Sequence, residues 1–102
     1  HGAERVLVSL DRDGAFLLDR EGLLLARAPE VEVRSSVGAG DAMLAWFTAA
    51  LLTGLPREEA LRRAVAAGSA ACLHYGTHAP SREEAEALLS RVGIDPAGNL
   101  PD

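Results

Sequence analysis

The stretch SSVGAGDAML, residues 35–44, separates a strand-rich first part of the chain from a helical second part. Before it, apolar residues form short runs that are divided by turn signals. After Ala39 they recur with helical spacing. Several strands followed by three helices predict the α/β class.

The strand-rich part is predicted to end near Val33. Its apolar runs are RVLVSL, GAFLLD, GLLLARAP and VEV, and each is expected to contain a strand. The sequence DREG, residues 19–22, is typical of a hairpin turn in which Gly22 is free to adopt a positive φ. The second and third runs are almost continuously apolar, which predicts burial on both faces of the sheet.

Cap residues set the expected limits of the first and third helices. The first is predicted to run from Gly40 to Thr53, with Gly54 at its C′ position. A capping box opens the third, because the Ser81 hydroxyl and the Glu84 carboxylate can each satisfy an unpaired amide. This helix is predicted to end near Gly93, and residues 94–102 to form a loose tail.

The second helix is expected to begin at Pro56 and to end at Gly76. One face of it carries the small residues Ala-Gly-Ser-Ala-Ala at positions 67–71. Such a face is unusual for an amphipathic core helix, because it lets another backbone, or a flat ligand ring, come close.

The composition restricts the partners and the compartment of the chain. At 102 residues it is at most one domain, and its net charge is −5 without a basic cluster. Nucleic acid and membranes are therefore not expected as partners. Cys72 is the only cysteine, so no intrachain disulfide is predicted and a cytoplasmic location is expected. No apolar run is long enough for a membrane span, and no signal peptide precedes the first strand.

The predicted elements are few for an independent α/β domain. They would leave apolar surface open, as expected if a larger domain supplied the rest. The chain also begins at His1 without an initiator Met. Residues 1–102 are thus predicted to form a single partial domain, with open sheet edges and faces that invite self-association into a homo-oligomer.

The glycine-alanine-glycine step predicts an anion-binding start of the first helix. A helix N-terminus presents unpaired amides and the positive end of the dipole, and glycines let a phosphate approach the backbone. Gly38, Ala39 and Gly40 would form this cradle. Asp41 would repel a phosphate, but it can accept the proton of an attacking hydroxyl while the amides hold the transferred phosphoryl group. This role requires the carboxylate and the amides to face one hollow.

The aspartate, the glycines and the histidines of this chain also fit other roles. An aspartate in a first helical turn is common, because it complements the dipole by about 0.3–1 kcal/mol. A dinucleotide-binding fingerprint is disfavoured by Met43 at the third-glycine position, and a P-loop by the absence of Lys. His74 and His78 are four residues apart, but they lack the further ligands of a zinc site, so no metal site is predicted on this chain.

Three stretches resemble, in order, the C-terminal part of the ribokinase/PfkB family of sugar kinases. VRSSVGAGDAMLAWFTAALLTG is similar to the family signature in which GAGD opens a helix. RVLVSLDRDGAFLL is similar to a strand-turn-strand segment, and EEALRRAVAAGSAACLHYGTHAPSREEAEALL to the stretch that follows. The resemblance covers nearly the whole chain and is strongest to the hexose-phosphate branch. It implies that the chain is a C-terminal fragment of a ribokinase-like fold.

The resemblance also implies roles for individual residues. Asp41 matches the catalytic base, which also touches the sugar, and the cradle matches the anion hole. The positions that match nucleotide-binding residues are Ser9, Asp11, Gly14, Gly40, Ala67, Gly68 and Ala71. The family uses ATP with Mg²⁺, and the metal ligands would lie mostly outside this chain.

The cradle and Asp41 predict phosphoryl transfer to a hydroxyl, and the resemblance implies ATP as the donor and a sugar phosphate similar to fructose 1-phosphate as the acceptor. The chain would supply the anion hole, the base and part of the ATP site, with the rest of a parent kinase as its partner. By itself it is expected to be inactive.

Two departures from the family pattern, Asp11 for a glycine and Trp46 for a small residue, favour the alternative of a non-catalytic nucleotide-binding or assembly module. Trp46 and Phe47 are both expected in the core.

Overall fold

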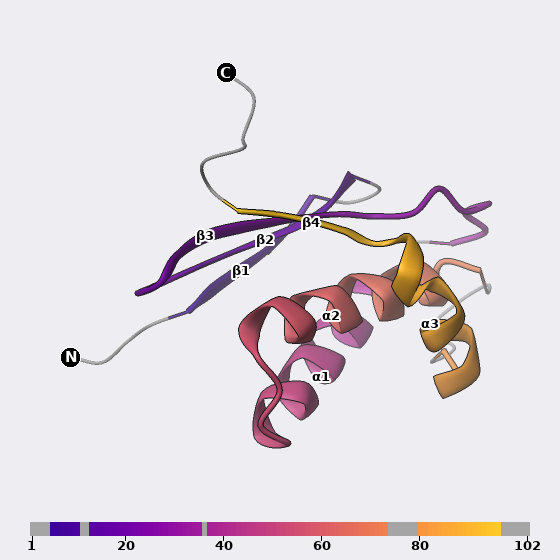
Figure 1. Cartoon of the computed structure of the whole chain (residues 1–102). Coiled ribbons are helices and arrows are strands. Elements are labelled where there is room, and N and C mark those ends of the chain that lie inside the picture. Colours follow the sequence, from indigo (N-terminus) through magenta and orange to yellow (C-terminus); the bar gives the residue numbers. More distant parts are fainter. Residues whose placement is uncertain (1–4, 11–12, 36, 74–79, 97–102) are drawn as a thin grey trace.

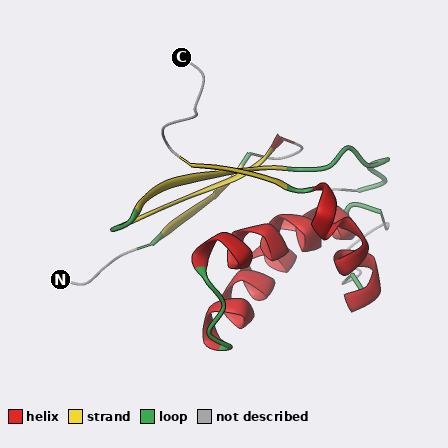
Figure 2. Ribbon diagram, viewed as in Figure 1, coloured by secondary structure: helices red, strands yellow, loops and turns green. Residues whose placement is uncertain are grey.

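The computed structural model describes residues 5–10, 13–35, 37–73 and 80–96. These residues form a sheet and three α-helices (Figures 1 and 2), which confirms the predicted α/β class. The elements are β1 (Val6–Ser9), β2 (Gly14–Asp19), β3 (Gly22–Arg27), α1 (Ala39–Leu52), α2 (Arg57–Ala71), α3 (Arg82–Leu88), the 3₁₀-helix η2 (Leu89–Arg91) and β4 (Gly93–Pro96).

The sheet is antiparallel, with the strand order β1-β2-β3-β4. The predicted hairpin is confirmed, because Asp19 pairs with Gly22 and Gly22 has a φ of 115°. The Asp19 side chain also accepts a hydrogen bond from the Glu21 amide at 2.9 Å, which closes the turn locally. The strand predicted at residues 31–33 is wrong, since these residues are irregular. Both edges of β3, the strand before them, are already paired with β2 and β4.

The helices lie on one side of the sheet (Figure 1). Four side chains of β2 and β3 are at most 4% exposed and form the sheet's part of the core: Ala15, Leu17, Leu24 and Ala26. On the other face Leu18 is 46% exposed, and Phe16, Leu23 and Leu25 are partly exposed. Burial on both faces was therefore a wrong expectation for this chain, because no described element covers the second face.

Helix α1 begins and ends one residue earlier than predicted, at Ala39 and Leu52. Gly54 has a φ of 86°, and its amide donates to the Leu51 carbonyl at 3.0 Å, which confirms its C′ position. Phe47 is buried as predicted, at 5% exposure. Trp46 is only partly buried, because it lies at the edge of the helix contact and not inside it.

Helix α2 is the central element of the fold. It packs against α1, against α3 and against strands β2, β3 and β4. Every residue from Ala64 to Ala71 is buried. A helix enclosed on all sides is apolar all round, and small side chains allow each neighbour to approach closely. The predicted extension of this helix to Gly76 falls partly outside the described residues.

The segment after α2 confirms one prediction and overturns another. The capping box of α3 is present, with Glu84 N donating to Ser81 Oγ at 3.1 Å and Ser81 N donating to Glu84 Oε1 at 2.9 Å. Residues 93–96, however, form β4 along β3 and are not a loose tail. Ile94 packs against the core and the Asp95 carboxylate forms an ion pair with Arg27, so this strand is fixed by its side chains. Residues 97–102 lie outside the described part.

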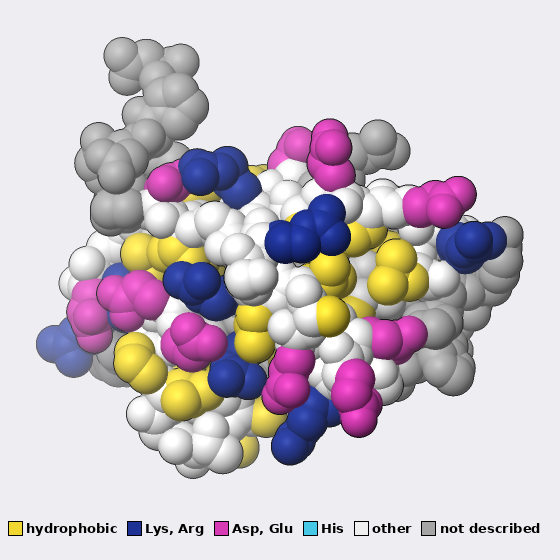
Figure 3. Space-filling view, turned by 45° about the vertical axis from the view of Figure 1, so that its right-hand side comes forward, with side chains coloured by type: hydrophobic (Ala, Val, Ile, Leu, Met, Phe, Trp, Pro, Cys, Tyr) yellow, Lys and Arg dark blue, Asp and Glu magenta, His cyan; other side chains and the backbone are white. Residues whose placement is uncertain are grey.

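Large hydrophobic side chains are exposed to solvent on the surface, as the sequence predicts. Six are 46–82% exposed: Val6, Leu18, Val33, Val37, Leu44 and Leu52. On the face drawn in Figure 3, acidic and basic side chains alternate, and neither sign covers it alone. None of the described helices is both long and apolar enough to span a bilayer.

A partly buried ion pair joins the hairpin to the start of α2. Arg57 Nε donates to Asp19 Oδ2 at 3.0 Å, its NH2 group lies 2.8 Å from Oδ1, and NH2 also donates to the Gly22 carbonyl at 2.7 Å. The two charged side chains are 10% and 6% exposed. The hydrogen bond from Arg57 holds the pKa of Asp19 below its ordinary value of 3.8, against the opposing effect of burial.

Replacing Asp19 with Asn should lower the free energy of unfolding at pH 7 by about 3 kcal/mol, because Arg57 keeps its buried charge without a partner. The folded-state pKa of Asp19 is depressed, so its stabilisation is complete above the unfolded value. It is lost as the pH falls through the lower folded value. Urea unfolding from pH 7 to pH 2 should therefore show the wild type and the variant converging in acid.

The control for this prediction is Glu21→Gln. Glu21 lies 3.9 Å from the same arginine, but its side chain is 74% exposed. Its loss should cost less than about 1 kcal/mol, as for other surface pairs. Equal costs for the two variants, or a pH-independent cost for Asp19→Asn, would contradict the assigned role of the buried pair.

Candidate functional site

The first turn of α1 begins at a glycine and has no side-chain cap. The N-cap residue is Gly38, which adopts the left-handed conformation with a φ of 86°. As a glycine it has no side chain that could accept a hydrogen bond from the first amides of the helix. The first bond of the helix runs from Ala42 N to Gly38 O, at 2.9 Å. Among the described residues, the amides of Ala39, Gly40 and Asp41 have no hydrogen-bond acceptor. A helix start of this kind can bind an anion through its backbone.

A groove of about 1610 Å³ lies in front of this helix start. Residues from four parts of the chain line it. Ser9, Leu10, Asp13 and Gly14 come from the connection between β1 and β2, Leu25 and Arg27 from β3, and residues 28–33 from the segment after β3. The start of α1 and the second half of α2 complete the lining. The positions contributed by the helices are Ala39, Gly40, Met43, Val65, Gly68, Ser69 and Cys72. The groove therefore places the exposed amides beside an apolar cavity wall.

Backbone hydrogen bonds hold the walls of the groove. The turn before β2 is closed by Leu10 N, which donates to Gly14 O at 2.8 Å. The segment between β3 and α1 is attached at both ends, because Ala28 N donates to Asp13 O at 3.3 Å and Arg34 N to Cys72 O at 2.7 Å. In the middle, the Arg91 NH2 group donates to the Glu30 carbonyl at 2.6 Å. The irregular segment is thus a fixed wall.

The structure brings together some of the residues that the sequence singled out. Ser9, Gly14, Ala39, Gly40 and Gly68 all line the groove, although they come from the separate elements β1, β2, α1 and α2. Their side chains are small or absent, which leaves backbone atoms accessible to a ligand. These five positions form one site in space.

Other predicted residues do not line the groove. Ala67 and Ala71 are at most 1% exposed, because only one stripe of the enclosed helix α2 reaches the cavity. Gly38 precedes the lining residues of α1, and Asp11 lies outside the described part. Gly68 also faces α1, so the small face of α2 accommodates a neighbouring backbone.

Asp41 is exposed and lies outside the groove lining. Helical periodicity explains this, since Gly40 and Met43 face the cavity while Asp41 points to the side on which Leu44 is 59% exposed. Of α1, the groove lining includes Ala39, Gly40 and Met43 but not Asp41, so the shared hollow predicted for the carboxylate and the amides stays a prediction. Asp41 is open to a reactant that approaches from the exposed face of α1.

Sequence reasoning missed part of the lining. Met43 and Val65 have apolar helical spacing that normally indicates core positions, and both are indeed buried. The irregular segment 28–33 has no local motif, because its place depends on bonds to distant residues. The stripe of Val65, Ser69 and Cys72 could have been found by extending helical periodicity from Gly68.

The polar groups of the groove are mostly acidic. Asp13, Glu30 and Glu32 line it, and the Arg27 guanidinium is paired with Asp95. Burial raises the pKa of the Cys72 thiol, which is therefore neutral at physiological pH. Within the described residues, no group of three His, Cys, Asp or Glu side chains is placed to hold a metal ion. His74 and His78 fall outside those residues.

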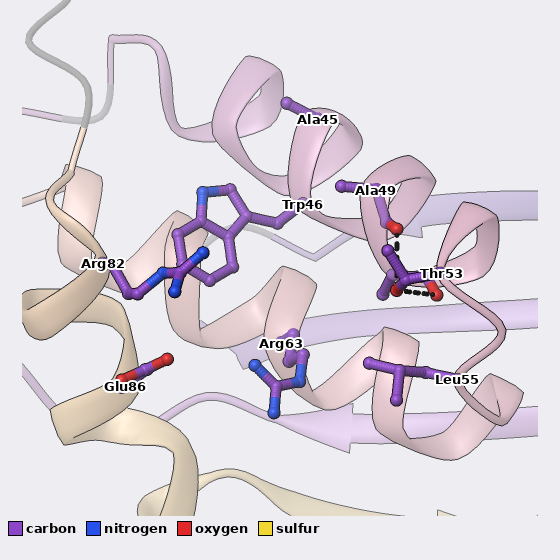
Figure 4. A pocket seen from close by; sticks show the side chains of 9 residues that line it. Ala45, Trp46, Ala49, Thr53, Leu55, Arg63, Arg82 and Glu86 are labelled. Carbon is purple, nitrogen blue, oxygen red and sulfur yellow. Dashed lines mark hydrogen bonds between the residues drawn. The ribbon is translucent and has the colours of Figure 1, made fainter.

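A second hollow, of about 560 Å³, lies between α1, α2 and α3 (Figure 4). Trp46 projects into it from α1, and Arg82 and Glu86 of α3 line its other side. The large side chain thus finds its space here and not in the core. Because Trp46 does not line the groove, its departure from the family pattern leaves the helix start unobstructed.

A groove that joins a sheet to the start of a helix, with small residues in its lining, is typical of a ligand-binding protein. Residues 1–85 match the pfkB family of carbohydrate kinases, and the chain belongs to this family. The 1-phosphofructokinase of Bacillus subtilis is 39% identical over 91% of the chain and 30% of its own length. The ATP-dependent 6-phosphofructokinase isozyme 2 of Escherichia coli is 42% identical over 87% of the chain and 30% of its length.

A solved structure extends the similarity to three dimensions. The ribokinase of Arabidopsis thaliana, complexed with ribose and ATP, has a TM-score of 0.76 at 32% identity over 83% of this chain and 28% of that one. The fold is therefore ribokinase-like, as the sequence motifs imply. The chain spans about 30% of the length of the curated relatives it matches.

Proposed function

We propose that this chain supplies the nucleotide groove, the anion cradle and the base of an ATP-dependent sugar-phosphate kinase. The observation that carries the proposal is the groove that joins the connection at Ser9 and Gly14 to the start of α1, a helix start without a side-chain cap. The remaining groups of the active site would come from polypeptide that this chain does not span. The acceptor would be a sugar phosphate of the fructose 1-phosphate kind.

The groove accommodates a nucleotide in a defined direction. Apolar side chains such as Val31, Met43 and Val65 offer a surface for the base, while the amides of α1 lie where the terminal phosphates can reach them. Backbone amides can stabilise the charge that develops on the transferred phosphoryl group. The acidic groups along the lining disfavour a bare polyphosphate, so a cation is expected to accompany it. The described residues offer no cluster for Mg²⁺, and its ligands are expected elsewhere.

Asp41 would act on the second reactant. Its exposed carboxylate can accept the proton of the acceptor hydroxyl as the hydroxyl oxygen bonds to the γ-phosphorus and the bond to the β-phosphate oxygen breaks. Because the carboxylate lies on the exposed side of α1, the sugar phosphate must be held over that side.

The proposal is tested in a chimera in which this chain replaces the matched region of the Bacillus subtilis 1-phosphofructokinase. Fructose 1-phosphate and tagatose 6-phosphate are offered as acceptors, and ADP release is measured. Turnover above that of the deletion without any insert supports the proposal. A chimera that is folded by circular dichroism and binds ATP without turnover contradicts it.

That second result would favour a non-catalytic nucleotide-binding or assembly module. The observation in favour of this alternative is the position of Asp41 outside the groove, together with the acidic lining. Its prediction is retained nucleotide binding in a protein that transfers no phosphoryl group. The chimera therefore separates the two functions.

The 102-residue chain alone should show no turnover and only weak ATP binding. The sugar and the metal would lack the ligands that the rest of the kinase is proposed to supply. Titration calorimetry with ATP should give a dissociation constant no tighter than about 1 mM, equivalent to about 4 kcal/mol. Micromolar binding would mean that the nucleotide site is complete within this chain.

A further inference from the structure

We infer that the second face of the sheet, which is turned away from the helices, is the surface on which the remaining polypeptide of a larger kinase packs. The inference rests on the proposed function only in that it takes this chain as one part of such a kinase. Six apolar side chains of β1, β2 and β3 make up the second face: Val6, Val8, Phe16, Leu18, Leu23 and Leu25.

The register of the strands places these side chains in two rows. In the first row, Leu18 lies between its partners Val6 and Leu23. In the second row, Phe16 of β2 lies between its two partners on β1 and β3. Residues paired directly across antiparallel strands point to the same face, with Cβ atoms about 4.5–5.5 Å apart. Each row is therefore continuous across three strands.

No described element covers the second face. The described α-helices all lie on the opposite side of the sheet (Figure 1). None of the six side chains belongs to the hydrophobic core on the helix side or packs against it. Val6 and Leu18 are 47% and 46% exposed, and the other four are partly exposed. Within the described residues, the second face is thus open to solvent.

The residue pattern is that of a covered face. An antiparallel sheet with one solvated face alternates apolar and polar residues along each strand. Strand β2 lacks this alternation, because the core residue Leu17 is flanked by Phe16 and Leu18. The charged side chains that the described strands place on this face are Arg27 and Asp95, and they form an ion pair with each other. An apolar patch of this kind marks an interaction site.

The occupant that fits best is polypeptide of the same kinase. An apolar sheet face is stable when another element buries it. This chain spans about 30% of the length of the curated relatives it matches, so most of such a protein lies beyond the matched region. A covalently attached occupant is favoured over a second copy, because attachment gives it an effective concentration of about millimolar order. Its contact surface must be apolar and uncharged, because the two rows offer no partner for a buried charge.

The second face also reaches the candidate nucleotide site. Leu25 belongs to the second row and lines the groove. Polypeptide that packs on this face would therefore border the groove, which is where the proposed function requires the missing groups of the active site.

Thiol labelling of Leu18→Cys measures whether the second face is covered. The substitution is made in the 102-residue chain and in the chimera, both with Cys72→Ala and without other cysteines, and the reaction with a small maleimide is timed. In the isolated chain the thiol should react nearly as fast as in the urea-unfolded chain. In the chimera it should react at least about 100-fold more slowly, because a covered position reacts only when the structure opens locally.

Glu21→Cys is the matched control. Glu21 lies in the turn between β2 and β3, its side chain is 74% exposed, and it is not part of the second face. Its labelling should be equally fast in the chain and in the chimera. Val6→Cys, in the first row on β1, decides the outcome if Leu18→Cys does not fold.

Slow labelling of Leu18→Cys in the chimera, with unchanged labelling of Glu21→Cys, supports the inference. Equal rates for Leu18→Cys in the two proteins overturn it. Protection that is already present in the isolated chain and grows with its concentration also overturns it, because a second copy is then the occupant. Labelling does not require turnover, so a folded chimera that protects this position but transfers no phosphoryl group contradicts only the proposed function.

Discussion

Replacing Asp41 with Asn in the chimera should lower kcat by about 10²–10⁴, the usual range for the loss of general-base assistance. The amide keeps the size of the side chain but cannot accept the proton of the acceptor hydroxyl. Since Asp41 does not line the groove, the affinity for ATP should remain within about twofold of its original value. Steady-state kinetics with both substrates varied measures the two effects separately.

The competing explanation of Asp41 is a helix-dipole effect, and Glu58→Gln controls for it. Glu58 is exposed and lies in the first turn of α2, so its neutralisation removes the same charge from an equivalent position. The expected loss of stability is about 0.3–1 kcal/mol in both variants. If Asp41→Asn retains turnover within threefold, as the Glu58 variant should, Asp41 is only a dipole partner and not the base.

Replacing Gly14 with Ala should destabilise the 102-residue chain by at least about 3 kcal/mol. An added Cβ would lie 1.9 Å from the Ala26 carbonyl oxygen and 3.0 Å from the Ala28 amide nitrogen. Both are backbone atoms of the β3 end, which cannot rotate away. The φ of 125° at Gly14 adds a conformational cost for any side chain. Urea unfolding, followed by circular dichroism, measures the change.

Gly22→Ala separates the steric clash from the conformational cost. Gly22 has a similar φ of 115°, but an added Cβ there would meet no atom within 4 Å. Its replacement should therefore cost only about 1–2 kcal/mol, the penalty for a side chain at positive φ. Equal losses in the two variants would show that the close approach to β3 is not what requires Gly14.

Local features of the sequence predicted much of the fold. The Asp19–Gly22 turn, the C′ glycine at position 54 and the capping box at Ser81 depend on neighbouring residues, and each is present in the structure. The failures involve distant contacts. Residues 31–33 have strand-like side chains but lie outside the four-stranded sheet, whereas residues 93–96 form its fourth strand by pairing with β3.

The candidate site, like the fold, has features that follow from neighbouring residues and features that depend on distant contacts. The sequence by itself determined the bare helix start, because a glycine cap and a missing side-chain cap are properties of consecutive residues. Only the tertiary structure decided that Ser9, Gly14 and Gly68 share a groove with this helix start, and that Asp41 does not. The physical reason is geometric: helical periodicity fixes the angle between Gly40 and Asp41, but packing of α1 on α2 decides which of them faces the cavity.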